Sequence, residues 1–241
     1  MTDICIVEVL GMLAYAQAWE YQKRLSAQIA RGERPPTLLL LEHPHTYTFG
    51  RRGQAENLLW DEAELQRRGV AVYWVDRGGD VTYHGPGQLV GYPLLPLGGV
   101  YTVSETEGSK PENKPIPHAD YVGYVRRLEQ IIIQALLALG VQAHTLAGQT
   151  GVWVDGKQWS APAKIAAIGV KVDVNGVTQH GFALNVNPDM SYWQGIIACG
   201  LKDAPAASLA ELLDPLPDFE TVYRAVISAF GAVFDYQMIE A

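Results

Sequence analysis

The chain has 241 residues, of which 48% are hydrophobic and 18% are charged. This length suffices for one sizeable core and is short for two ordinary domains, so we expect residues 1–241 to form a single domain. The formal net charge of −8 argues against general binding to nucleic acid.

The sequence also contains no sign of a membrane segment or an export signal. No window approaches the roughly 18 consecutive apolar residues of a transmembrane helix. The first residues, "MTDICIVEVLG", include an acidic residue where a signal peptide carries positive charge. We therefore expect a cytoplasmic protein without membrane attachment, in which the two cysteines, Cys5 and Cys199, are reduced.

Apolar runs alternate with amphipathic segments in the first half of the chain. Strands are predicted at residues 4–10, 37–42 and 70–75. Helices are predicted at residues 11–32 and 61–69, each closed by a glycine. A charged, proline-rich segment without periodicity, residues 105–118, predicts an exposed loop that looks like an insertion.

The second half of the chain combines helices with hairpins. Helices are predicted at residues 119–140, 206–213 and 218–234. Asp155-Gly156 and Asn175-Gly176 lie between alternating segments and are the dipeptides that type I′ turns favour, so they predict antiparallel hairpins. Because strands and helices intermingle without regular βαβ repeats, we predict an α+β fold with a mixed, largely antiparallel β-sheet packed by helices.

The most unusual stretch is "RGGDVTYHGPGQLVGYPLL", residues 77–95, which places four glycines, a proline and a histidine in its first eleven positions. Glycine tolerates positive φ and lets a ligand or another backbone approach closely. The stretch is compatible with an irregular hairpin, and it lacks the pattern and the following helix of a nucleotide-binding loop. A loop that lines an apolar or thioester-bearing ligand fits its residues better.

Two side chains are candidates for a base and a nucleophile. Lys164 precedes small and apolar residues on an expected strand. Most lysines keep their ammonium group at the surface. If Lys164 were buried, its pKa would be lowered and its amine could act as a base. Cys199 lies in "GIIACGL" and is either a small buried hydrophobe or a nucleophile that a neighbouring amine activates. His43 and His45 lack further ligands at zinc spacing, so we expect no metal site.

Together these segments resemble the lipoyl(octanoyl) transferases, which move an octanoyl group from acyl carrier protein to a lysine of a lipoyl domain. The resemblance rests on "RGGDVTYHGPGQLVGYPLL", "KIAAIGVKV", "QHGFALNVNPD" and "ACG", with "EHPHTYTFGR" upstream, and it covers nearly the whole chain. Ala198, where many members have proline, and "QWSAPA" before Lys164 depart from the family pattern. The family's fold is similar to the catalytic domain of biotin and lipoate protein ligases.

The resemblance implies a reaction and a site. It implies that Cys199 forms a thioester acyl-enzyme, that Lys164 is its catalytic partner, and that no cofactor is needed. It also implies an acyl pocket lined by Arg77, Gly78, Gly79, Asp80, Val81, Thr82, Tyr83, His84, Ala167, Ile168, Gly169, Gly181, Phe182 and Ala183.

The resemblance also implies partners. The donor would be octanoyl-acyl carrier protein. The acceptors would be lipoyl domains of 2-oxoacid dehydrogenase complexes and the glycine cleavage H protein. The enzyme would be a monomer that catalyses the first step of endogenous lipoylation. Carrier proteins are usually acidic, so we expect some basic residues near the pocket mouth, drawn from Arg51, Arg52, Arg67, Arg68 and Arg77.

Two other functions are compatible with the sequence. An ATP-dependent lipoate- or biotin-type protein ligase would form an acyl-adenylate and would not need Cys199, and "FGRRG" is similar to the arginine-glycine loop of that class. A non-catalytic binder of acyl or lipoyl carriers would keep the pocket without turnover. The presence of both Cys199 and Lys164 argues against such a binder.

Overall fold

The computed structural model of the chain describes residues 3–97, 120–198 and 205–241. The expected loop at 105–118 and Cys199 therefore lie outside the described residues. Within the described ranges, no helix has the length and apolar character that crossing a membrane requires.

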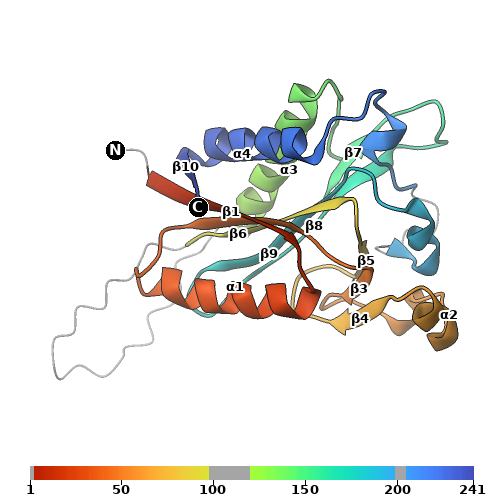
Figure 1. Cartoon of the computed structure of the whole chain (residues 1–241), viewed down its shortest axis with the longest axis horizontal. Coiled ribbons are helices and arrows are strands. Elements are labelled where there is room, and N and C mark those ends of the chain that lie inside the picture. Colours follow the sequence, from red (N-terminus) through yellow and green to blue (C-terminus); the bar gives the residue numbers. More distant parts are fainter. Residues whose placement is uncertain (1–2, 98–119, 199–204) are drawn as a thin grey trace.

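A seven-stranded mixed sheet forms the centre of the fold (Figure 1). Its strand order is β10-β1-β2-β6-β9-β8-β7. In that order the strands are Tyr236–Glu240, Asp3–Met12, Thr37–Glu42, Gln88–Leu94, Thr178–Asn185, Ala163–Val172 and Val152–Val154. The strands β10, β1 and β2 are parallel, and every other neighbouring pair is antiparallel. The predicted α+β fold with a largely antiparallel mixed sheet is confirmed.

Helices cover both faces of this sheet. Helices α3 (Tyr121–Ala138) and α4 (Phe219–Phe234) lie on one face, and α1 (Tyr15–Ala30) lies on the other (Figure 1). The side chains of Asp120 and Asp218 accept hydrogen bonds from backbone N–H groups of the first turns of α3 and α4. These caps satisfy donors that a helix N-terminus otherwise leaves unpaired, which explains where both helices begin.

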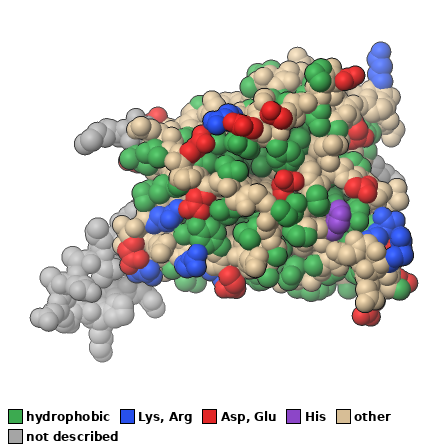
Figure 2. Space-filling model, viewed as in Figure 1, with side chains coloured by type: hydrophobic (Ala, Val, Ile, Leu, Met, Phe, Trp, Pro, Cys, Tyr) green, Lys and Arg blue, Asp and Glu red, His purple; other side chains and the backbone are tan. Residues whose placement is uncertain are grey.

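The large core lies between the sheet and the α3–α4 layer, and a smaller one lies under α1. Leu128, Phe182 and Phe230 are buried in the large core. Figure 2 shows apolar side chains in the band between the two helical layers, where β1 and β10 form the edge of the large sheet. The large apolar side chains exposed on these two strands are Ile4, Val9, Met12 and Ile239.

A second, three-stranded sheet lies beside the first (Figure 1). It has the order β4-β3-β5, with strands Ala71–Trp74, Thr46–Phe49 and Val81–His84. Helix α2 (Glu62–Arg67) precedes β4. Strand β5 leads through a short turn into β6 of the large sheet, so the glycine-rich stretch of the sequence is the segment that joins the two sheets.

The structure corrects several sequence predictions. Strands β3 and β10 were not predicted, and residues 206–213 contain only a 3-10 turn, Leu209–Glu211. Asp155-Gly156 opens a long connection between β7 and β8. The link between β8 and β9 is not a type I′ turn, because Gly176 has positive φ (79°) but Asn175 does not. The Asp173 carboxylate accepts the backbone N–H of Asn175 and stabilises this other geometry.

Adjacent leucines on α3 test which face of this helix stabilises the fold. Leu136 is 0% exposed in the large core, whereas Leu137 is 62% exposed. We expect Leu136→Ala to lower the free energy of unfolding by about 2–5 kcal/mol through loss of apolar contacts and a residual cavity. Leu137→Ala should change it by no more than about 0.5 kcal/mol. Urea unfolding of both variants is the measurement, and equal losses would contradict the packing described here.

Candidate active site

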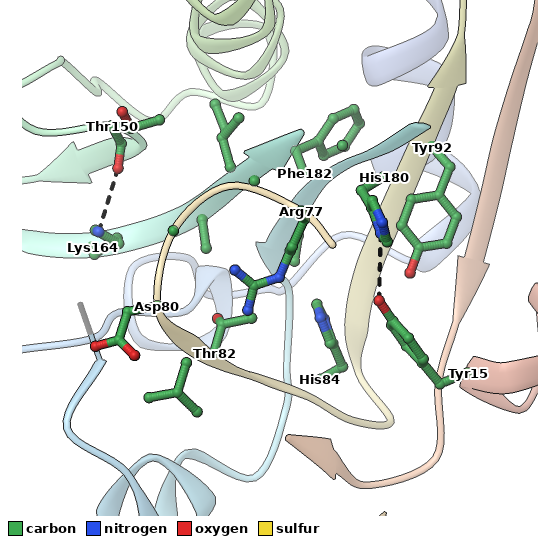
Figure 3. A pocket seen from close by; sticks show the side chains of 17 residues that line it. Tyr15, Arg77, Asp80, Thr82, His84, Tyr92, Thr150, Lys164, His180 and Phe182 are labelled. Carbon is green, nitrogen blue, oxygen red and sulfur yellow. Dashed lines mark hydrogen bonds between the residues drawn. The ribbon is translucent and has the colours of Figure 1, made fainter. Parts of the chain in front are cut away.

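A cavity lies where the two sheets meet, between α1, β5, β6, β8 and β9 (Figure 3). It contains about 540 Å³ of empty space, which includes its open mouth. Residues of the sequence-predicted site that line it are Lys164, Arg77, Gly79, Asp80, Val81, Thr82, His84, Ala167, Ile168, Gly169, Gly181, Phe182 and Ala183.

Two residues of the predicted pocket do not line this cavity. Gly78 lines a neighbouring cavity instead. The Tyr83 side chain packs on the other face of β5, where its ring lies 5.3 Å from that of Tyr192 and its hydroxyl is 2.9 Å from Nδ1 of His45. Side chains alternate between the two faces of a strand, so Tyr83 faces away from the cavity that Thr82 and His84 line.

Sequence reasoning missed four residues that line the cavity: Tyr15, Tyr92, Thr150 and His180. Tyr92 and His180 lie inside the segments that carry the family resemblance, so their position in those segments was an available signal. Tyr15 begins α1, far from these segments in the sequence, and only the packing of α1 on the sheet brings it to the cavity.

A bulge in β8 determines the side of the sheet on which Lys164 lies. Trp153 of β7 pairs with Lys164 and the preceding Val152 pairs with Ala166, so Ile165 is an extra residue without a partner in β7. Ile165 and Ala166, although consecutive, are both buried in the large core. The bulge reverses the alternation of side chains and places Lys164 on the cavity side together with Ala167.

The Lys164 ammonium and backbone make defined contacts. Its Nζ lies 3.4 Å from the carbonyl oxygen of Thr150, to which it donates (Figure 3), and 4.7 Å from the centre of the Trp153 ring. Its backbone N–H donates to the carbonyl of Pro205 at 2.8 Å, and its carbonyl accepts from the N–H of Ala207 at 2.9 Å. Lys164 thus belongs to the large sheet and also fixes the segment that follows residues 199–204.

The described residues before Cys199 are held by Asn57, a neighbour of the cavity residue Asp80. The backbone N–H of Ile197 donates to the carbonyl of Asn57 at 2.9 Å. The Asn57 side-chain amide donates in turn to the carboxylate of Asp80 at 2.5 Å. Both flanks of the Cys199 segment are therefore connected to residues that line the cavity. The flank before Cys199 reaches Asp80 through Asn57, and the flank after residues 199–204 bonds directly to Lys164.

Arg77 lies in the middle of the cavity wall, between Lys164 and the aromatic end (Figure 3). Its side chain is 7% exposed in the folded chain. The guanidinium donates to the hydroxyl and carbonyl of Thr48 and to the carbonyl of Gly78. These bonds fix the glycine-rich stretch against β3 of the small sheet.

The glycines at Gly79 and Gly87 are explained by the chain's own conformation. Both have positive φ, 90° and 86°, which disfavours any residue with a Cβ. A Cβ at Gly87 would also lie 2.2 Å from the carbonyl oxygen of Asn187. The tight turn between β5 and β6 therefore needs glycine whether or not a ligand is bound.

A hydrogen-bonded group of buried aromatic and histidine side chains forms the end of the cavity away from Lys164 (Figure 3). His180 Nε2 lies 2.9 Å from the Asp76 carboxylate, and the Tyr15 hydroxyl lies 3.4 Å from His180 Nδ1. A carboxylate only accepts, so Nε2 carries the proton and Nδ1 accepts from Tyr15. His180 has φ of 57°, and its backbone N–H donates to Gln22 of α1 at 2.7 Å.

Burial keeps the histidines near this end of the cavity neutral. It lowers the pKa of His180 in spite of the Asp76 carboxylate, and it lowers the pKa of His84 well below its usual value. It also lowers the pKa of His43 to about 4. His43 Nε2 is 2.7 Å from the Tyr92 hydroxyl, whereas the His45 ring stacks on Tyr192, so the two histidines of "EHPHTY" serve different clusters. In the described part of the chain, no group of three His, Cys, Asp or Glu residues could hold a metal ion.

Solved structures of lipoate protein ligases have the same fold. A bi-partite lipoate protein ligase from Thermoplasma acidophilum superimposes with a TM-score of 0.74 at 15% identity, covering 100% of this chain and 87% of that chain. A lipoate-protein ligase A bound with ATP gives a TM-score of 0.71 at 15% identity, with coverage of 100% and 90%. At this identity the likeness concerns the fold.

Sequence comparisons identify the family. A family model described as lipoyl protein ligase A/B catalytic domain matches residues 14–231. A protein named octanoyltransferase from Chloroflexus aurantiacus is 44% identical, over 95% of this chain and 93% of the relative. A second protein named octanoyltransferase, from Gloeobacter violaceus, is 42% identical over 97% of this chain and 91% of the relative. The chain belongs to the lipoyl protein ligase A/B catalytic-domain family.

The buried neutral histidines predict how stability depends on pH. Below a pH of about 6.5 the unfolded chain binds protons that folded His43, His84 and His180 do not, so the free energy of unfolding falls as pH falls. His43 alone should contribute a loss of about 2 kcal/mol between about pH 7 and about pH 5. Urea unfolding at the two pH values measures this. The slope should be shallower in His43→Gln, and equal stability at both pH values would refute the assignment.

Proposed function

We propose that the chain transfers an octanoyl group from octanoyl-acyl carrier protein to a lysine of a lipoyl domain, the first step of endogenous protein lipoylation. The main support is the cavity, which gathers Lys164 and apolar walls from β5, β8 and β9, next to the anchored flanks of Cys199. Relatives 42–44% identical over nearly their whole length are named octanoyltransferases, which supports the same reaction.

The first half of the reaction forms an acyl-enzyme. The Cys199 thiolate attacks the carbonyl carbon of the octanoyl thioester, the carbonyl-sulfur bond to the carrier breaks, and the carrier leaves as a thiol after taking up a proton. In the second half the lysine amine of the acceptor attacks the Cys199 thioester, an amide forms, and the Cys199 sulfur leaves. A thioester is already activated, so neither half needs ATP.

Lys164 is the proposed acid and base of both halves. In its neutral form it takes the Cys199 proton and later gives it to the leaving carrier thiol; in the second half it takes the proton that the attacking amine loses. Its place on the cavity side of β8, created by the bulge, supports this role. Arginine could not replace it, because a guanidinium stays protonated in proteins.

The acyl chain is proposed to extend from Lys164 towards the buried end formed by Tyr15, Tyr92 and His180 (Figure 3). Ala167 and Ala183 supply apolar contact along this path, whereas the Phe182 ring packs in the large core. Each methylene that the cavity takes from water contributes about 0.8 kcal/mol to binding.

The second cysteine is a poor candidate for the nucleophile. Cys5 is 0% exposed in the large core, and burial raises the pKa of its thiol to about 12. Since the thiolate is the nucleophile, Cys5 is unreactive at neutral pH. The acyl-enzyme is therefore assigned to Cys199.

An ATP-dependent lipoate ligase is the second candidate, because a ligase bound with ATP has the same fold. Such an enzyme would form an acyl-adenylate and would keep its activity without Cys199. The resemblance alone supports the remaining parts of the proposal: lipoyl domains of 2-oxoacid dehydrogenase complexes and the glycine cleavage H protein as acceptors, one domain over residues 1–241, and a monomer.

Intact-mass spectrometry tests the proposed chemistry. With octanoyl-acyl carrier protein and no ATP, the protein should gain the mass of one octanoyl group, and Cys199→Ala should gain none. Lys164→Ala and Lys164→Arg should both form the adduct about a hundredfold more slowly, as expected for loss of a general base.

Cys5→Ala and Lys157→Ala are the matched controls, since one removes the buried thiol and the other an exposed lysine of the β7–β8 connection. Both should acylate like the unmodified chain. An adduct that persists in Cys199→Ala, or turnover that depends strictly on ATP, would favour the ligase.

A further inference from the structure

A second cavity adjoins the first at Lys164. It contains about 1010 Å³ of empty space, including its open side, and shares Gly79, Thr150, Lys164, Ile168 and Gly169 with the acyl cavity. The remaining lining comes from Arg52 and Gly78, from Val125 of α3, from Gly148 and Gln149, and from Val170 of β8. A molecule that occupies both cavities would therefore pass Lys164 at their junction.

The charged side chains that line the second cavity, Arg52 and Lys164, are both cationic, and no carboxylate lines it within the described ranges. This contrasts with the formal net charge of −8 of the whole chain. The Arg52 backbone N–H donates to the carbonyl of Gly79 at 3.0 Å, which fixes its loop on the wall. No ion pair joins the exposed Arg52 guanidinium to a described carboxylate. An anionic ligand fits this rim, whereas a lysine ammonium would be repelled.

The loop around Gln149 contributes an acceptor without a donor among the described residues. The side-chain oxygen Oε1 of Gln149 is buried, and no described residue donates a hydrogen bond to it. Gln149 itself is half-buried and lines the cavity, so a rotation of its side chain towards the cavity would let Oε1 accept a hydrogen bond from a ligand N–H group. The loop is held in place because the Gly151 N–H donates to Glu129 at 3.1 Å, and Glu129 pairs with Arg126 at 2.6 Å.

From these observations we propose that the second cavity binds the phosphopantetheine arm of the acyl donor. The arm carries the thioester at one end, amide N–H groups along its length and an anionic phosphodiester at the other end. The thioester would lie at Lys164, an arm amide would donate to Gln149, and the phosphodiester would lie beside Arg52. This assignment rests on the proposed function, because only a carrier-bound donor brings such an arm.

Two small donors distinguish the contact with the phosphate from the contacts with the amides and the thioester of the arm. Acyl-enzyme formation is measured without acceptor, using S-octanoyl-4′-phosphopantetheine and S-octanoyl-pantetheine, which lacks the phosphate. Arg52→Glu should lower kcat/KM about tenfold for the phosphorylated donor, chiefly by raising KM, because one charge-assisted contact is lost. The kcat/KM for S-octanoyl-pantetheine should stay nearly unchanged. Arg52→Lys should keep most of the activity because it keeps the charge.

Arg51→Glu is the matched control, because Arg51 is the exposed neighbour of Arg52 and does not line either cavity. It should affect neither donor. Gln149→Leu should weaken both donors by similar factors, because both contain the amides.

The assignment would be overturned if Arg52→Glu affected both donors equally, or if Arg51→Glu slowed the phosphorylated donor as much as Arg52→Glu does. It would also be overturned if Arg52→Glu slowed transfer to the lipoyl domain but left acyl-enzyme formation unchanged. In that case the second cavity would bind the acceptor. Failure of the proposed function looks different. In that case the unmodified chain would form no acyl-enzyme with either donor.

Discussion

One unpaired residue in β8 determines which groups can meet in the cavity. Because Ile165 has no partner in β7, the alternation of side chains reverses, and Lys164 lies on the same side as Ala167 and Gly169. In a regular strand Lys164 would share its side with Ala166, which packs in the large core. There the ammonium would be buried among apolar side chains at a high cost in free energy. The bulge thus serves the fold and the proposed chemistry at once.

The cavity depends on two sheets that are joined by the glycine-rich stretch. Arg77 fixes this stretch to Thr48 of the small sheet, while β6 continues it into the large sheet. The same stretch supplies Asp80, which holds Asn57 and through it the chain before Cys199. Local conformation accounts for the glycines at 79 and 87, whereas Asp80, Val81, Thr82 and His84 between them line the cavity.

Local patterns in the sequence predicted most elements, because apolar periodicity and helix-ending glycines act over a few residues. Strand β10 was missed because the strand that it pairs with among the described residues is β1, at the other end of the chain. The family segments named most of the residues that line the cavity, yet Tyr83 faces away and Tyr15 was missed. The bulge at Ile165 is invisible to periodicity, since it follows from pairing with β7 and not from residue type.

The double attachment of His180 to α1 has a mechanical consequence. Gln22 bonds to its backbone and Tyr15 to its ring, and the left-handed conformation at His180 persists only because its surroundings enforce it. Sliding α1 along the sheet would break both bonds together. The inner end of the cavity is therefore tied to α1 at two points, so that a shift of α1 would reshape the surface that Tyr15 and His180 present to a ligand.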